Sequence, residues 1–327
     1  MSPSLPPEPA IQRALTVPEG HSRQQPGRLE TSLRRGRRVL VVEARPPDSP
    51  DLAPLLHSAE RLRDAVDAIQ LTDMPFATPH VANLAAGAAL RQAGHEVVLN
   101  VSCRDRNSIA QQGTLLGAAA LGIQNIFCIR GDDPRVGDHP RSHGVFELSG
   151  LELISLAKNL RDNASYASGR RLSVAPALFI GAALAPHARY GDGAHSLASR
   201  KVAAGADFLV TQPLCDSETF PRFFAAAAPP VQSCSVFAGV GAITRIQTLD
   251  ILSASEEVFV PPQFQEALRA ASTDARRLQI GMDHALQIAE QALTQGARGV
   301  LVYPFDCGVE EIRAFCQALR PMLNDVP

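Results

Sequence analysis

The sequence predicts an α/β protein built as a single (β/α)8 TIM barrel, and two observations predict it. Short β-type apolar runs alternate with longer helical segments from residue 38 onward, as in parallel sheets, where each crossover needs about a dozen residues or more. Four glycines each follow an apolar helix and precede a strand, at the place where helices commonly end: Gly94, Gly122, Gly205 and Gly296. A doubly wound open sheet has the same alternation and stays open as an alternative on the pattern alone. The chain has neither a G-x-G-x-x-G nor a P-loop motif, so neither a Rossmann nor a P-loop site is indicated.

The alternation defines eight expected strands, with helices between and after them. The strands are Val39–Ala44, Ala68–Thr72, Glu96–Ser102, Asn125–Arg130, Leu172–Gly181, Phe208–Gln212, Ser235–Val240 and Gly299–Tyr303. The helices are Pro54–Val66, Val81–Ala93, Ser108–Leu121, Leu151–Asn163, Ala194–Ala204, Glu218–Ala226, Thr244–Ser253, Asp274–Gln295 and Val309–Met322.

Residues 1–37 differ in composition from the rest of the chain. They are rich in proline and arginine and show no periodic apolar pattern. Such a segment cannot bury a core, so we expect a flexible tail whose removal up to residue 36 leaves stability unchanged. Residues 38–327 then form the barrel domain.

Composition excludes several classes of function. The chain has 327 residues, of which 45% are hydrophobic, and a net charge of −2, so no nucleic acid or anionic membrane partner is expected. No apolar run approaches the ~20 residues of a membrane span. Six scattered cysteines without a C-x-x-C pair predict reduced thiols in a cytoplasmic protein. His139 and His143 are a weak metal candidate, because Pro140 prevents the helix that would align them, and we predict no metal site.

Polar side chains at strand ends are the candidates for chemistry, because ligands bind at that end of a barrel. Glu43 ends the first strand, where partial burial raises a carboxyl pKa and allows it to act as an acid near neutral pH. The run Ile126–Ile129 breaks at Arg130-Gly131-Asp132, and Asp132 either carries a functional charge or caps the adjacent turn. Gln212 ends the sixth strand, where its amide suits a pterin edge.

Four motifs in this order resemble the methylenetetrahydrofolate reductase family. They are the Glu43 E-x-x-P-P strand end, Cys103-Arg-Asp-Arg-Asn107, the Gly131–Pro140 GD…GDHP loop and Lys201–Gln212. The likeness runs from about Val39 to about Leu319 and is greatest to the reductase halves of proteins fused to a homocysteine methyltransferase. It implies a homo-oligomeric flavoprotein that uses FAD and NAD(P)H to interconvert 5,10-methylenetetrahydrofolate and 5-methyltetrahydrofolate, in one-carbon metabolism and methionine biosynthesis.

The resemblance also implies roles for individual residues. Glu43 is the general acid, and Asp132 lies under flavin and folate. Arg200-Lys201 holds the flavin phosphate and ribose, unless the pair is simply a solvated helix end. The other implied flavin contacts are Thr72, Asn100, Arg130, Gly131 and Phe146, and the implied folate contacts are Gln212 and Thr248.

The chain also departs from the family pattern. Gly181–His187 lacks the flavin-contacting Tyr and the His-Pro-Glu of many relatives, Leu252 replaces a stacking phenylalanine, and Asp306-Cys307 replaces an Asn-Arg pair. Three alternatives therefore stay open: a flavin-independent reductase of the same fold, a pterin-binding methyltransferase-type protein, and a non-catalytic folate-binding relative, against which the retained Glu43 argues.

Overall fold

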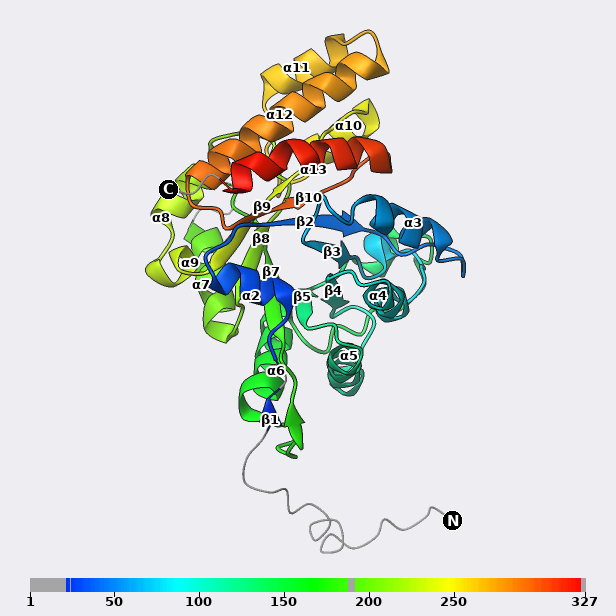
Figure 1. The fold of residues 1–327 in the computed structure, drawn as a ribbon, viewed down its shortest axis with the longest axis vertical. Coiled ribbons are helices and arrows are strands. Elements are labelled where there is room, and N and C mark those ends of the chain that lie inside the picture. The colour runs from blue at the N-terminus through cyan, green and yellow to red at the C-terminus, as the bar shows by residue number, and fades with distance from the viewer. Residues whose placement is uncertain (1–21, 24, 188–191, 325–327) are drawn as a thin grey trace, which may run out of the picture.

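A closed barrel of parallel strands forms the centre of the molecule (Figure 1). The computed structural model describes residues 22–23, 25–187 and 192–324. The barrel order is β10-β2-β3-β4-β5-β7-β8-β9, which confirms the predicted (β/α)8 fold. The strands are β2 Val39–Ala44, β3 Ala68–Leu71, β4 Val97–Ser102, β5 Asn125–Ile129, β7 Phe179–Leu184, β8 Phe208–Thr211, β9 Ser235–Val240 and β10 Gly299–Val302.

Helices surround the barrel and cover its outer face. They are α2 Arg28–Arg34, α3 Ala53–Arg61, α4 Asn83–Gln92, α5 Ser108–Ala120, α6 Gly150–Asn163, α7 Asp192–Ala204, α8 Thr219–Ala226, α9 Pro229–Gln232, α10 Ile246–Ala254, α11 Pro262–Ala270, α12 Asp274–Thr294 and α13 Val309–Asn324. Two short 3₁₀ turns, η1 Pro75–Ala77 and η2 Pro134–Val136, follow β3 and β5. None of the helices in the described ranges is long and apolar enough to cross a bilayer.

Local sequence explains where the helices begin and end. Ser149 and Glu152 form a capping box at the start of α6, and the Asn107 side chain accepts from the backbone of Ala110 at the start of α5. Each of these contacts satisfies a backbone N–H that has no partner within the helix. The four glycines expected to end helices all have a left-handed backbone, with φ of 120° at Gly205, for example.

Aromatic rings fill the middle of the barrel. Phe208 stacks on Phe179 and Phe237, with ring centroids 5.0 and 5.1 Å apart, a separation typical of packed aromatic pairs. Gly181 is required opposite them, because a β-carbon there would overlap the Phe208 ring. The strands alternate, so their other face packs against the helices in a second, larger core.

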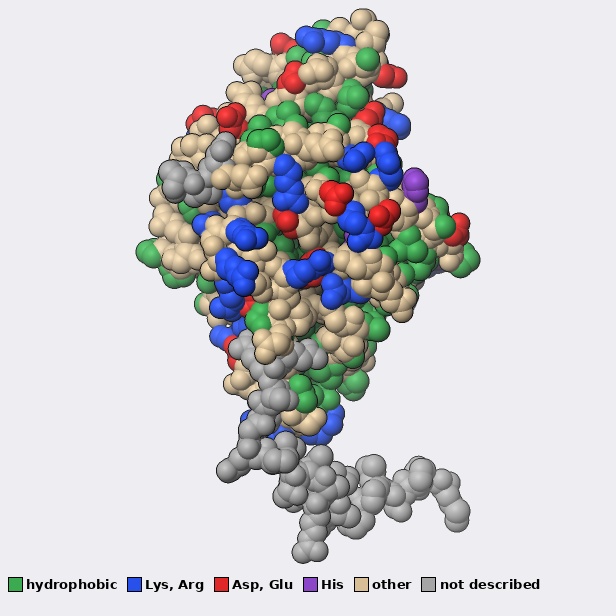
Figure 2. Space-filling view, in the orientation of Figure 1, with side chains coloured by type: hydrophobic (Ala, Val, Ile, Leu, Met, Phe, Trp, Pro, Cys, Tyr) green, Lys and Arg blue, Asp and Glu red, His purple; other side chains and the backbone are tan. Residues whose placement is uncertain are grey.

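Helix α2 corrects the predicted boundary of the N-terminal tail. Leu29 and Leu33 belong to the cluster that fills the lumen and are 1% and 6% exposed. Arg28 contacts Gly94 and Glu96, just before β4, so α2 closes the end at which the strands begin. Arginines cover its outer side, over which Figure 2 shows clustered basic side chains. The prediction of a tail reaching residue 37 is therefore wrong for this helix, and residues 1–21 lie outside the described chain.

The predicted fifth strand, Leu172–Gly181, is also corrected. The chain forms a two-residue strand, β6 (Val174–Ala175), which pairs with β1 (Ser22–Arg23) outside the barrel. The barrel strand β7 begins only at Phe179. Pro176 has no backbone N–H for a ladder, which explains the break between the two. Helices α2, α9 and α11 were not predicted either, and in α9 and α11 prolines occupy the first turn, where they are tolerated.

Candidate active site

The open end of the barrel carries the polar side chains that the sequence placed at strand ends. Residues facing the lumen alternate along each strand, and the apolar ones form the lumen cluster. Toward the carboxyl ends of the strands the same alternation turns polar side chains inward. These are Glu43, Gln70, Thr72, Asn100, Ser102, Gln212 and Tyr303. The predicted residues of strands β2, β3, β4 and β8 are thus brought to one mouth.

Glu43 is the titratable group of this mouth. Its carboxylate has no hydrogen-bond partner among the described residues, although Arg45 lies close enough to interact electrostatically. Burial raises the Glu43 pKa from 4.5 to about 7, and the positive charge of Arg45 opposes the shift. A carboxyl with this pKa holds a proton at neutral pH and can also release it. This environment is compatible with an acid, and the catalytic role of Glu43 stays a prediction.

Thr72 and Asn100 supply neutral polar atoms beside Glu43. The Thr72 hydroxyl makes only a long contact of 3.5 Å to the Ala44 carbonyl. Asn100 is 5% exposed, and its Oδ1 atom and the Ser102 hydroxyl are buried without a partner in the described structure. Buried polar atoms without partners are uncommon and cost free energy.

The loop after β5 holds four of the predicted residues. Arg130 is exposed, and its guanidinium lies over the Phe146 ring, 4.9 Å from the centroid. Gly131 has φ of 84° and fits closely against Arg104 and Ser102. Asp132 is exposed, and its Oδ2 atom accepts a 2.8 Å hydrogen bond from the Phe76 backbone N–H. The carboxylate thus caps the loop after β3, whereas the turn that follows Asp132 in sequence is capped by Asp133.

The two predicted basic residues on the other side of the barrel differ in their exposure to solvent. Arg200 is exposed, whereas Lys201 is turned inward and donates a 2.6 Å hydrogen bond to the Ala183 carbonyl at the end of β7. Burial lowers the Lys201 pKa, and Glu257 nearby partly opposes this. The Arg200-Lys201 pair is thus divided between solvent and interior.

Gln212 and Thr248 were predicted to contact folate. The Gln212 side chain is partly exposed at the mouth, and its backbone N–H bonds to Leu184. Thr248 donates its hydroxyl to the Asp306 carboxylate. Asp306 belongs to one of the departures from the family pattern, and in this chain it bonds to Thr248.

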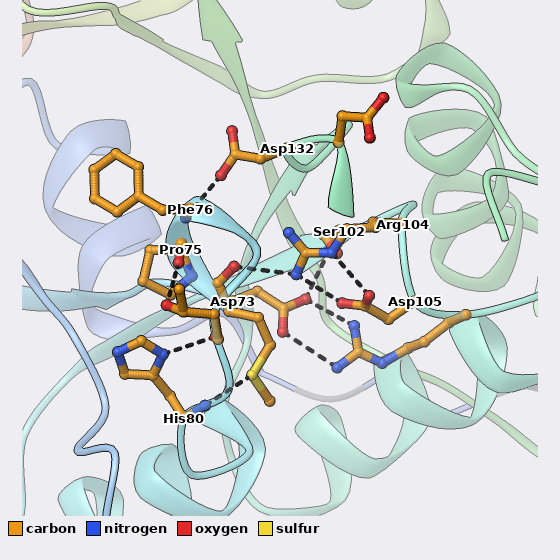
Figure 3. A network of polar contacts seen from close by, with 12 residues as sticks. Asp73, Pro75, Phe76, His80, Ser102, Arg104, Asp105 and Asp132 are labelled. Atoms are coloured by element: carbon orange, nitrogen blue, oxygen red, sulfur yellow. Dashed lines mark hydrogen bonds and ion pairs between the residues drawn. The ribbon is translucent and has the colours of Figure 1, made fainter. Parts of the chain in front are cut away.

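Sequence reasoning missed an ion pair under the mouth. Asp73, whose side chain is fully buried, accepts from Arg106 Nη1 at 2.7 Å and from the Ser102 backbone N–H at 2.9 Å (Figure 3). Arg104 lies beside it, paired with Asp105 and bonded to the Met74 carbonyl. The CRDRN motif thus fixes the loop after β3. Its alternating charges were the signal available in the sequence.

Two hollows adjoin these residues. One of about 330 Å³ lies between β2, α3 and α13 and is mostly apolar, with Glu43, Arg45 and Cys307 in its lining. A larger one of about 790 Å³ lies near the starts of α12 and α13. It is polar, and Arg245, Arg277 and Asp306 border it. No group of three or more His, Cys, Asp or Glu that could hold a metal is found in the described ranges.

The fold and the site define a class: a (β/α)8 barrel whose strand ends present one titratable carboxyl among neutral polar groups. The family model of methylenetetrahydrofolate reductase matches residues 28–310. The chain belongs to that family, whose members are folate-acting oxidoreductases.

Solved structures share the fold at low sequence identity. An uncharacterised protein from Clostridium thermocellum, which binds two copies of 5-methyl-5,6,7,8-tetrahydrofolic acid, is 10% identical with a TM-score of 0.63, covering 92% of this chain and 100% of that one. An F420-dependent secondary alcohol dehydrogenase in complex with an F420-acetone adduct is 12% identical with a TM-score of 0.55, covering 88% and 100%. At these levels of identity, the similarity to both structures is a similarity of fold alone.

Proposed function

We propose that the protein interconverts 5,10-methylenetetrahydrofolate and 5-methyltetrahydrofolate, with NAD(P)H as the electron source and a bound flavin between them. The observation that supports this most is Glu43, a carboxyl at the mouth of the barrel with its pKa raised to about 7. Family membership over residues 28–310 supplies the substrate class.

Glu43 has the chemistry of the proton donor in this reaction. When it protonates N10 of methylenetetrahydrofolate, the bond from N10 to the methylene carbon breaks and its electron pair stays on N10. The methylene is then a cationic iminium at N5, and a hydride added to its carbon gives the methyl group. An acid positioned for such a step contributes ~10²–10⁴-fold to the rate.

Asp132 and Gln212 have supporting roles in this proposal. Asp132 places a negative charge at the rim, which favours a cationic iminium nearby. Its hydrogen bond to Phe76 fixes the carboxylate while leaving it exposed. Gln212 offers an amide that can both donate to and accept from a pterin edge.

The residues of the mouth fit a flavin ring. The free acceptors at Asn100 and Ser102 and the weakly bonded hydroxyl of Thr72 suit a flat ring whose edge carries N–H and carbonyl groups. When bound, a flavin accepts a hydride from NAD(P)H and supplies it to the folate. Further residues that would hold it are Arg130, Gly131, Phe146, Arg200 and Lys201.

A second candidate is direct hydride transfer from the nicotinamide without flavin. Lys201 favours it, because its ammonium is already bonded to the Ala183 carbonyl and is turned away from Arg200. Glu43 keeps its role as proton donor in this case, because either source of hydride acts on the same iminium carbon.

The absorbance spectrum of freshly purified protein separates the two candidates. We expect a band near 450 nm, release of FAD on denaturation, and oxidation of NAD(P)H with menadione. Methyltetrahydrofolate should also reduce menadione in the presence of the protein. Turnover of folate by protein without FAD would select direct hydride transfer. No folate turnover with FAD and NAD(P)H supplied would contradict both.

A further inference from the structure

An exposed aromatic side chain lies between the two predicted catalytic carboxylates. Phe76, in the loop after β3, is 56% exposed. The guanidinium of Arg45, two residues after Glu43, lies over its ring at 4.9 Å from the centroid. On the other side its backbone N–H donates to Asp132. The ring therefore stands at the rim between the ends of β2 and β5.

The backbone that presents this ring is strained. Met74, Phe76 and Ala77 have φ values of 47°, 54° and 53°, a left-handed region that residues other than glycine seldom adopt. Strain of this kind persists only where the surroundings enforce it, and it clusters at functional sites. Exposure of a phenyl ring adds to the cost. Folding alone gives no reason for such an arrangement.

The surroundings do enforce it. Arg104, nearly fully buried, donates to the Met74 carbonyl at 3.1 Å, and Thr78 bonds to the Pro75 carbonyl at 2.8 Å. Gly137, in the loop after β5, fits so closely that a β-carbon there would overlap the Ala77 carbonyl. Figure 3 shows Arg104 and Asp105 on one side of the loop, with the Phe76 ring directed away from them.

The other aromatic rings near the barrel are already engaged. The lumen phenylalanines stack on one another, and Tyr303 stacks on Phe305. Within the described ranges, Phe76 and Phe259 are the exposed phenylalanines, and Phe259 stacks on His187. Phe146, which also lies under an arginine, packs against the larger core, whereas Phe76 is exposed.

We propose that Phe76 determines substrate specificity by stacking on a planar ring of the bound folate. The inference rests on the proposed function and adds a residue to it. The ring of Phe76 provides the flat apolar surface. The Arg45 side chain, which lies over the ring, can change position when the ligand binds. Asp132 holds the loop in place through the Phe76 backbone, so the carboxylate also acts as a positioning residue for the ring.

Binding of 5-methyltetrahydrofolate to the purified protein tests this directly, because it needs no turnover. We compare wild type with Phe76→Ala, Phe76→Leu and Phe76→Tyr by calorimetry, and check each fold by thermal unfolding. Stacking of a heteroaromatic ring on an aromatic side chain predicts a Kd raised roughly ten-fold or more for the alanine and leucine variants. The tyrosine variant should stay within about two-fold of wild type, since stacking is retained.

Phe259→Ala is the matched control, because it removes the other exposed phenyl ring. Its folate affinity should equal that of wild type. An unchanged Kd in Phe76→Ala, with wild type binding folate, overturns the inference and leaves the proposed function standing. Equal loss in Phe76→Ala and Phe259→Ala, or loss in the tyrosine variant, also overturns it. A wild-type protein that binds no folate overturns the proposed function.

Discussion

Tyr303 lies beside Glu43 at the mouth of the barrel. Val302 pairs with Val42 in the parallel register of β10 and β2, so the next residue on each strand, Tyr303 and Glu43, faces the lumen side by side. The Tyr303 hydroxyl donates to the Thr211 carbonyl at 3.0 Å. Burial and the nearby charges of Glu43 and Glu257 raise the Tyr303 pKa. The tyrosine thus stays neutral near physiological pH.

Replacing Glu43 by glutamine should abolish proton donation while leaving the site intact. We expect Glu43→Gln to lose ~10²–10⁴-fold in folate turnover, because an amide keeps the shape but has no acidic proton. Oxidation of NAD(P)H with menadione should continue, since it needs no proton from this residue. Tyr303→Phe is the control and should keep most of its folate activity. Folate turnover at the wild-type rate in Glu43→Gln would remove this residue from the mechanism.

The raised pKa of Glu43 also predicts a pH dependence of stability. Because the folded pKa is about 7 and the ordinary value is 4.5, the protonated carboxyl stabilises the native state relative to the carboxylate. This contribution is complete below about pH 4.5 and is lost as pH rises through 7. Compared with Glu43→Gln, wild type should lose on the order of 3 kcal/mol of unfolding free energy between acidic and alkaline pH.

Urea unfolding of both proteins at pH 5 and pH 8.5 measures that difference. The comparison cancels the titration of groups that the two proteins share. A difference that stays constant between the two pH values would show that Glu43 titrates normally in the folded protein, and would weaken its candidacy as the acid.

Arg106 should be needed for stability because it neutralises a buried charge. Asp73 is fully buried and accepts two bonds from the Arg106 guanidinium. Arg106→Ala leaves this carboxylate unpaired, and loss of one partner of a buried pair costs about 3–5 kcal/mol. Arg135→Ala is the control, since its pair with Asp133 is exposed and should matter little. Similar denaturation midpoints for the two variants would contradict the assigned role of the Asp73 pair.

Helix α2 should stabilise the barrel, contrary to the sequence-based expectation for this segment. Leu29 is 1% exposed within the lumen cluster, and truncating a buried leucine costs about 2–5 kcal/mol. Leu29→Ala should therefore lower the melting temperature clearly, and removal of residues 1–36 should lower it further. Leu121→Ala, at a leucine that is 46% exposed, is the matched control. Full stability of the truncated protein would show that α2 is dispensable.

The sequence predicted the barrel because its signals are local. Apolar alternation and glycine stops determine strands and helices one at a time. An open doubly wound sheet shares these signals, so the resemblance to a known family was also needed to favour the closed barrel. Helix α2 was not predicted because its two leucines stand among arginines. This short pattern does not identify a buried helix unless the end of the barrel that it covers is already known. The fifth strand was misplaced for a related reason, since Val174–Ala175 and Phe179–Leu184 are both apolar and only the three residues from Pro176 to Leu178 separate them.

Sequence reasoning named candidate residues at strand ends and in the loop after β5, but it missed Phe76. Glu43, Thr72, Asn100 and Gln212 follow from strand ends and alternation. The position of Phe76 depends instead on contacts from loops distant in sequence, including Asp132, 56 residues away. A strained backbone of this kind cannot be read from local propensity, because it exists only once those contacts form.

The two basic residues proposed for the flavin phosphate should behave differently from each other. Arg200 is exposed, so Arg200→Ala should weaken FAD binding by an amount that decreases in high salt, since a charge-assisted hydrogen bond contributes about 1.5–3 kcal/mol. Lys201 bonds to the Ala183 carbonyl, so Lys201→Met should lower thermal stability as well as cofactor retention. Fluorescence titration of FAD at two salt concentrations, with melting curves in parallel, measures both effects. If the two single variants lose FAD equally and melt like wild type, Lys201 binds the phosphate directly and must leave the Ala183 carbonyl when the cofactor enters.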